Sequence, residues 1–102
     1  MQAMKKDRVL YSFKEFKVIE KPNYLLIVNT RKPFDEGHTH LTNGDLNTAI
    51  AMIKLVYNEE LPDSRDVYFL TSLIRLSKSR KYRLRIDKLI KSIEYDVPFH
   101  DI

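Results

Sequence analysis

Apolar residues recur at helical spacing through the C-terminal part of the chain and predict three amphipathic helices. The first covers residues 46–57, where the apolar positions lie three or four residues apart. Residues 67–93 carry two such stripes, and at about 100° per residue the second is displaced from the first by more than a quarter turn. One straight helix cannot bury both stripes against one core. We therefore predict two helices that meet at a corner around Ser77-Lys78-Ser79, since serine is a frequent N-cap.

Alternation of apolar and polar residues predicts strands in the N-terminal part. Residues 9–19 are typical of a strand, but the apolar positions change face between Phe13 and Phe16, so we expect a bulge or bend near Lys14-Glu15. Residues 24–28, YLLIV, are apolar on both faces. They indicate a central strand covered on both sides, or on one side plus an interface.

The predicted fold class is α+β: an N-terminal antiparallel β-hairpin, with residues 37–41 left open as a third short strand, followed by three α-helices. A chain of 102 residues fits one small globular domain, residues 1–102. We expect flexible or loosely packed ends at residues 1–8 and 97–102.

Composition narrows the class of protein. Hydrophobic residues make up 43% and charged residues 31%, which is typical of a globular chain. There is no cysteine, so disulfides and thiolate metal sites are excluded and a cytoplasmic location is expected. No segment approaches the roughly 20 apolar residues of a membrane span, and we expect no membrane partner.

The net charge of +4 hides a strong asymmetry along the chain. Residues 35–66 carry seven acidic and two basic side chains, whereas residues 75–91 carry eight basic side chains opposed only by Asp87. The helical pattern places most of these cations opposite the apolar stripe, with Leu84 pointing outward among them. The predicted binding surface for an anionic partner comprises Arg75, Lys78, Arg80, Lys81, Arg83, Leu84, Arg85, Lys88 and Lys91.

Two functions are compatible with this surface. The first is a small non-enzymatic module whose basic C-terminal helix binds an anionic partner, with nucleic acid as the first candidate. A helix-turn-helix arrangement with Ser79 near the start of a recognition helix is one form of it. The alternative is a protein-interaction module, an accessory or inhibitor protein that acts through complementary acidic and basic surfaces and is open to homodimerisation. A basic solvated face that only keeps the domain soluble is the simplest interpretation.

His38 and His40 are weak candidates for metal binding. Residues two apart in an extended segment face the same side, so both imidazoles can approach one cation. A zinc site needs at least one or two more ligands, and no spacing in the chain specifies them. The alternative is that both histidines hydrogen-bond a loop next to the first helix. We expect no cofactor.

No motif in the chain specifies a reaction or identifies a family. The serines lack a glycine-elbow context, and the only two glycines, Gly37 and Gly44, are too sparse for a phosphate-cradling loop. Adjacent acids at Asp35-Glu36 and Glu59-Glu60 are typical of solvated loops. We therefore expect that the protein is not an enzyme.

Overall fold

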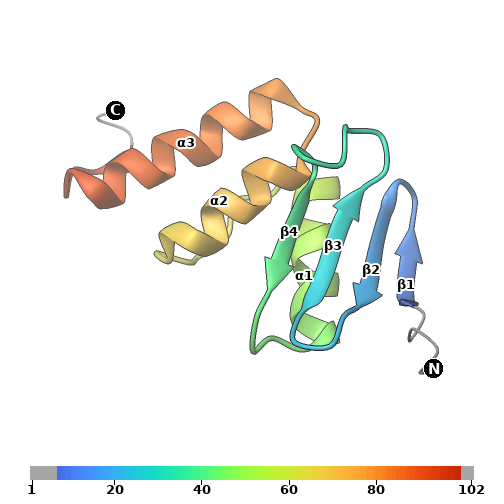
Figure 1. Ribbon diagram of the computed structural model, residues 1–102. Helices are drawn as coiled ribbons and strands as arrows, with labels where there is room; N and C mark the ends of the chain where they lie inside the picture. Colours follow the sequence, from blue (N-terminus) through green and yellow to red (C-terminus); the bar gives the residue numbers. More distant parts are fainter. Residues whose placement is uncertain (1–6, 100–102) are drawn as a thin grey trace, which may run out of the picture.

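Figure 1 shows a computed structural model of the chain, in which residues 7–99 are described. Within this range four strands form one antiparallel sheet in the order β1-β2-β3-β4, and three helices follow. The protein is thus α+β, as the sequence predicts. The strands are β1 (Arg8–Phe13), β2 (Phe16–Glu20), β3 (Leu25–Asn29) and β4 (His38–Leu41), and the helices are α1 (Leu46–Tyr57), α2 (Val67–Leu76) and α3 (Arg80–Glu94).

The stretch predicted as one bent strand is a hairpin. β1 and β2 pair antiparallel with Phe13 opposite Phe16, and Lys14 and Glu15 form the turn between them. The change of face in the apolar pattern is therefore a reversal of chain direction, and the bulge or bend predicted at this point is wrong. The predicted short strand over residues 37–41 is present as β4, so the sheet has four strands where the sequence indicated two or three.

The turn carries backbone strain at Lys14, whose φ of 53° lies in the left-handed region. This conformation costs a side-chain-bearing residue roughly 1–2 kcal/mol but costs glycine almost nothing. We expect Lys14→Gly to raise the free energy of unfolding by about 1 kcal/mol in urea denaturation. The matched control is Lys17→Gly in extended β2, which should lose roughly 0.5–1 kcal/mol. Equal losses in both variants would show that the turn is not strained.

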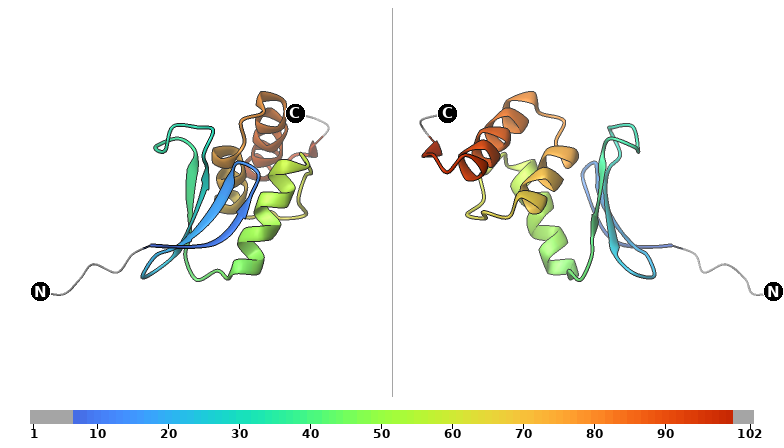
Figure 2. Two further views of the ribbon diagram at one scale, coloured as in Figure 1. Left: turned by 90° about the vertical axis from the view of Figure 1, so that its right-hand side faces the viewer. Right: turned by 60° about the vertical axis from the view of Figure 1, so that its left-hand side comes forward.

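The core lies between one face of the sheet and two helices. α1 and α2 cover this face, and α3 packs against α2 on the side away from the sheet (Figures 1 and 2). Val18 and Ile27 of the sheet, Ile53 of α1, Leu73 of α2 and Tyr82 of α3 are all completely buried. The apolar stripes of all three helices therefore meet in one continuous core.

The other face of the sheet carries no helix among residues 7–99 (Figure 2). Leu26 and Val28 lie on it, yet they are only 5% and 7% exposed. They stand opposite His40 and His38 of β4, which belong to a row of four neighbouring rings whose two outer pairs are stacked. Its ring centroids are 4.3, 5.3 and 4.3 Å apart in the order Tyr24, His40, His38 and Phe34. A row of rings, rather than a second layer, thus shields the apolar outer face of β3.

α2 and α3 are separate helices that lie side by side and run antiparallel (Figure 1). The predicted serine corner joins them. Ser77 Oγ accepts from the Ser79 backbone N–H at 3.0 Å, and Ser79 Oγ accepts from the Tyr82 N–H at 3.2 Å as the N-cap of α3. Among the helices of residues 7–99, none has the length and apolar character needed to cross a bilayer.

Most of the ends that were predicted to be flexible, residues 1–6 and 100–102, lie outside the described residues. In the described residues that follow α3, the backbone N–H of Val97 donates to the Ser92 carbonyl at 3.1 Å. Ser92 Oγ donates to the Val97 carbonyl at 2.6 Å. These two bonds hold the chain that leaves α3 against the last turn of the helix.

Candidate nucleic-acid interface

The end of β3 and the loop after it fix the corner from which α3 starts. Asn29 Nδ2 donates to the Leu76 carbonyl at 2.9 Å, and Lys32 Nζ donates to the carbonyls of Arg75 and Ser77 at 2.8 and 3.0 Å. These carbonyls belong to the end of α2, where backbone acceptors lack intrahelical donors. A lysine there also complements the negative end of the helix dipole. The sheet thereby sets the position and direction of the helix pair.

Lys32 is also the centre of a cluster of positive charge. Its pKa is lowered from the usual value, first by desolvation and then by the neighbouring charges of Arg83 and Arg75, while Glu36 acts in the opposite direction. Desolvation and like charge both disfavour the protonated amine. Lys32 therefore lies close to two arginines at the corner, with Glu36 as an opposing charge.

The guanidinium of Arg75, a predicted site residue, is turned toward the sheet. Its Nε donates to the His38 carbonyl and its Nη2 to the Asp35 carbonyl, both at 2.7 Å. The side chain thus ties α2 to β4 and covers an outward-facing acceptor of this edge strand. Arg75 thus adds positive charge to the surface, and its hydrogen bonds hold α2 against β4 and the loop before it.

The exposed cations form a surface that runs from the corner along α3. We call it the α3 basic face and define it as Lys78, Arg80, Lys81 and Arg85, all of which are exposed. Among residues 7–99, the side chain of Arg85 makes one hydrogen bond, a long one of 3.4 Å to the Glu59 carbonyl. The structure brings together these four predicted residues on one outward surface, with their charged groups in water.

Farther along α3 two predicted cations have partners. Lys91 Nζ lies 3.0 Å from Asp87 in an i,i+4 pair, and the hydrogen bond to this carboxylate raises the pKa of Lys91. Lys88 Nζ lies 5.2 Å from the centroid of the Phe99 ring. Exposed pairs of this kind contribute little stability. The Asp87 carboxylate reduces the positive potential toward the C-terminal end of α3, so the basic face is strongest at its start.

Arg83 and Leu84 lie beside a shallow hollow of about 360 Å³ between α2 and α3. Leu84 is 53% exposed, in agreement with the outward position predicted for it. Arg83 Nε is buried and has no hydrogen-bond partner among residues 7–99. The hollow is lined by Ile74, Arg80, Arg83, Leu84 and Asp87, so an apolar floor is framed by two arginines and one carboxylate.

The acidic segment 35–66 does not cover the α3 basic face. Three ion pairs join described residues: Arg8 with Glu20, Lys21 with Asp7, and Lys91 with Asp87. None of these pairs, which are confined to residues 7–99, connects the acidic segment to α3. The end of this segment contacts the start of α3 through Glu60, whose carbonyl accepts from Tyr82 Oη at 2.8 Å, and through Glu59, whose Oε1 accepts from Ser79 Oγ at 3.0 Å. The acidic and basic surfaces are thus both open to solvent.

His38 and His40 face the same side of β4, as predicted, but their rings stack with aromatic neighbours. The Nδ1 of His38 is hydrogen-bonded to the Phe34 carbonyl, and since a carbonyl only accepts, this nitrogen carries the proton. No group of three metal-ligating side chains occurs within residues 7–99. His100, the third histidine, lies outside the described residues. The two histidine rings belong to the row of rings that covers Leu26 and Val28.

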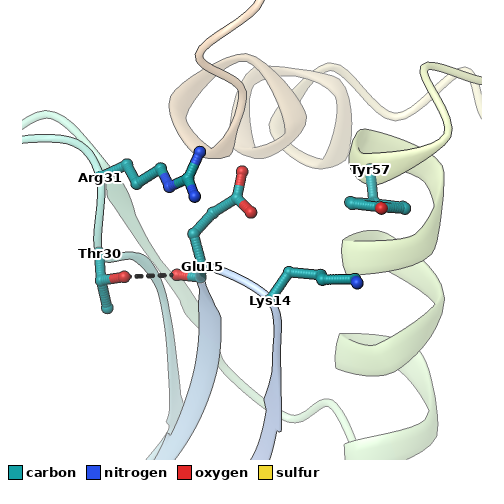
Figure 3. A pocket seen from close by; sticks show the side chains of 5 residues that line it. All are labelled: Lys14, Glu15, Thr30, Arg31 and Tyr57. Atoms are coloured by element: carbon teal, nitrogen blue, oxygen red, sulfur yellow. Dashed lines mark hydrogen bonds between the residues drawn. The ribbon is translucent and has the colours of Figure 1, made fainter.

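A second hollow, of about 450 Å³, lies at the end of the sheet (Figure 3) and contains none of the predicted site residues. It forms where the β1–β2 turn, the chain after β3 and the end of α1 meet. Its lining side chains are Lys14, Glu15, Thr30, Arg31 and Tyr57. One local signal was present in the sequence: a Lys-Glu turn between two strands, where glycine or asparagine is usual.

No model of a protein family matches the chain, and comparison with curated proteins and with solved structures gives no significant match. Function is therefore inferred from the surfaces of this molecule. The arrangement of α2 and α3 bears on one predicted form of nucleic-acid binding. Helix-turn-helix motifs cross at roughly 90–120°, whereas α2 and α3 lie side by side and antiparallel (Figure 1). This geometry disfavours a helix-turn-helix.

Proposed function

We propose that the protein is a non-enzymatic module that binds nucleic acid through the phosphate backbone, with the α3 basic face as the contact surface. The observation that carries the proposal is the solvent exposure of Lys78, Arg80, Lys81 and Arg85 without an ion pair among residues 7–99. Lys and Arg side chains that meet phosphates release condensed counterions, and this release supplies most of the affinity of sequence-tolerant binding.

The rigid attachment of α3 also supports the proposal. Tyr82 Oη donates to the Glu60 carbonyl at 2.8 Å, and Ser79 caps the helix and contacts Glu59. These bonds fix the backbone of the first turn of α3, so that binding an anionic partner costs mainly the side-chain entropy of the cations. The positive cluster around Lys32 and Arg83 adds a long-range attraction for polyanions.

The salt dependence of binding tests the proposal. Fluorescence anisotropy with a labelled oligonucleotide should give an apparent association constant that falls linearly with salt on logarithmic axes. If four cations each meet one phosphate, the slope is roughly −3, at about −0.7 per contact for a single strand. Arg85→Ala should flatten the slope by about 0.7. No binding to single or double strands at low salt would overturn the proposal.

A protein partner is the second candidate function, and the hollow at Leu84 favours it. An exposed leucine framed by Arg80 and Arg83 fits an acidic segment that carries an apolar side chain. The exposed acidic side chains of residues 35–66 offer such charge, including on a second copy of the chain. Leu84→Ala, which removes the apolar side chain without adding charge, should weaken self-association in sedimentation velocity or capture of one stoichiometric partner, while nucleic-acid affinity changes little.

A further inference from the structure

Tyr57 presents an aromatic surface to the hollow at the end of the sheet. Its side chain lies at the end of α1 and is 45% exposed. Phe13 holds the ring by an edge contact, with the centroids 5.0 Å apart and the planes at 79°. Fixed aromatic rings at protein surfaces stack unpaired bases, because every base has a π-face.

Glu15 places a carboxylate in the same hollow. In Figure 3 its side chain points into the space between Arg31 and Tyr57. Its backbone is held by Thr30, whose N–H and Oγ1 both donate to the Glu15 carbonyl, at 2.8 and 2.9 Å. Although two cations line the hollow, no ion pair joins Glu15 to either of them within residues 7–99. This acceptor is therefore available to a ligand.

An ionised carboxylate only accepts hydrogen bonds, so it selects a ligand edge that donates. Among the four bases, guanine carries two adjacent donors, the N1–H and the N2 amino group, on its Watson–Crick edge. These two donors match the two oxygens of Glu15. Base pairing would occupy that edge, so only an unpaired base meets the carboxylate.

Lys14 and Arg31 supply positive charge at the rim of the hollow. Both are exposed, and the backbone N–H of Arg31 is fixed by Asn29 Oδ1 at 2.9 Å. Lys14 adopts a left-handed conformation that glycine would adopt without strain. Strained residues concentrate at functional sites, and a cation at this turn suits contact with a phosphate.

The hollow connects with the α3 basic face. A smaller hollow of about 170 Å³ is also lined by Glu15 and Tyr57, and it extends to Lys78 and Ser79 at the corner before α3. The smaller hollow is also lined by Glu59, so a strand that continues from the larger hollow toward Arg80 passes this carboxylate before it reaches the basic face. Both surfaces lie at the same end of the molecule.

We infer that this hollow binds one unpaired nucleotide of a single strand, with guanine preferred. The base stacks on Tyr57, its donating edge meets Glu15, and the flanking phosphates meet Lys14 and Arg31. The inference rests on the proposed function, since the α3 basic face supplies the remaining contacts of the strand.

Short oligothymidylates that carry guanine, inosine, adenine or thymine at one central position test the inference by fluorescence anisotropy. We expect the guanine strand to bind about tenfold tighter than the adenine and thymine strands, with inosine, which lacks the N2 amino group, in between. Glu15→Gln should remove the guanine preference. Tyr57→Ala should weaken all four strands about tenfold, whereas Tyr57→Phe retains the stacking and the affinity. Lys14→Gly should weaken binding although the protein is more stable.

The outcomes separate the inference from the proposed function. Equal affinity for the four strands, or a guanine preference that survives Glu15→Gln, overturns the inference while salt-dependent binding to α3 stands. If no strand binds, the proposed function fails, and titration with guanosine monophosphate, followed by the NMR signals of Tyr57, decides the site alone. Shifts at millimolar nucleotide that Glu15→Gln abolishes support the nucleotide site, and no shift overturns it.

Discussion

Reversal of three charges on α3, in the variant Arg80→Glu/Lys81→Glu/Arg85→Glu, is expected to lower nucleic-acid affinity by roughly a hundredfold or more at low salt. Each substitution removes one phosphate contact and adds a repulsive charge at the start of the helix. These residues are exposed. Among residues 7–99, their side chains make one hydrogen bond, the weak bond from Arg85 to the Glu59 carbonyl. The fold should therefore persist, as circular dichroism and thermal unfolding will show.

A matched control separates local contact from overall charge. Lys17, Lys54 and Arg65 are exposed cations on β2, on α1 and before α2, away from the α3 basic face. Their reversal to glutamate changes the net charge by the same amount. If the control triple weakens binding as much as the α3 triple, the affinity follows from total charge and the α3 basic face is not the contact surface.

Replacement of Tyr82 by alanine is expected to lower the free energy of unfolding by about 3–5 kcal/mol. Tyr82 is completely buried in the core cluster, and its hydroxyl holds α3 to the loop after α1 through Glu60. Tyr82→Phe keeps the ring and loses only the hydrogen bond, so it should cost about 1 kcal/mol. Denaturant titration of both variants measures the difference, and equal costs would mean that packing of the ring contributes nothing.

Tyr82 also makes stability depend on pH in the alkaline range. Burial, the largest cause, raises the pKa of its phenol to about 12, with Glu59 and Glu60 acting in the same direction and Arg85 against it. Below about pH 10, folded and unfolded chains both carry the proton, and the group has no effect. Between pH 10 and 12 the unfolded chain loses the proton first, so the free energy of unfolding falls. Tyr82→Phe should fall less steeply over this range, and identical slopes would contradict the raised pKa.

The sheet was predicted less completely than the helices for a definable reason. Helical periodicity extends over many residues, so the phase shift between the stripes of α2 and α3 located the break at Ser77 to Ser79. The β1–β2 hairpin turns on only two residues, Lys14 and Glu15. A bulge and a tight turn both shift the apolar alternation, and only a glycine or asparagine at the turn would have distinguished them.

The residues of the candidate site also differ in how well the sequence predicts them. The exposed cations of α3 and the outward Leu84 follow from helical phase, and the structure places them as predicted. The role of Arg75 in tying α2 to β4 does not follow, because its two acceptors are backbone carbonyls of β4 and of the loop before it, about 40 residues earlier. Backbone acceptors have no residue type, so no sequence pattern records them.

The sequence by itself determined the α+β order, the helix break and the concentration of positive charge on one helix, because each depends on residues that are close along the chain. Only the tertiary structure decided that the acidic segment leaves the α3 basic face uncovered. It alone also brought Glu15 and Tyr57 into one hollow with Lys14 and Arg31. The hollow depends on how the β1–β2 turn and the end of α1 pack against each other. The open basic face depends on how α3 packs against α2. Such packing is set by the shape of the whole core, which local periodicity does not encode.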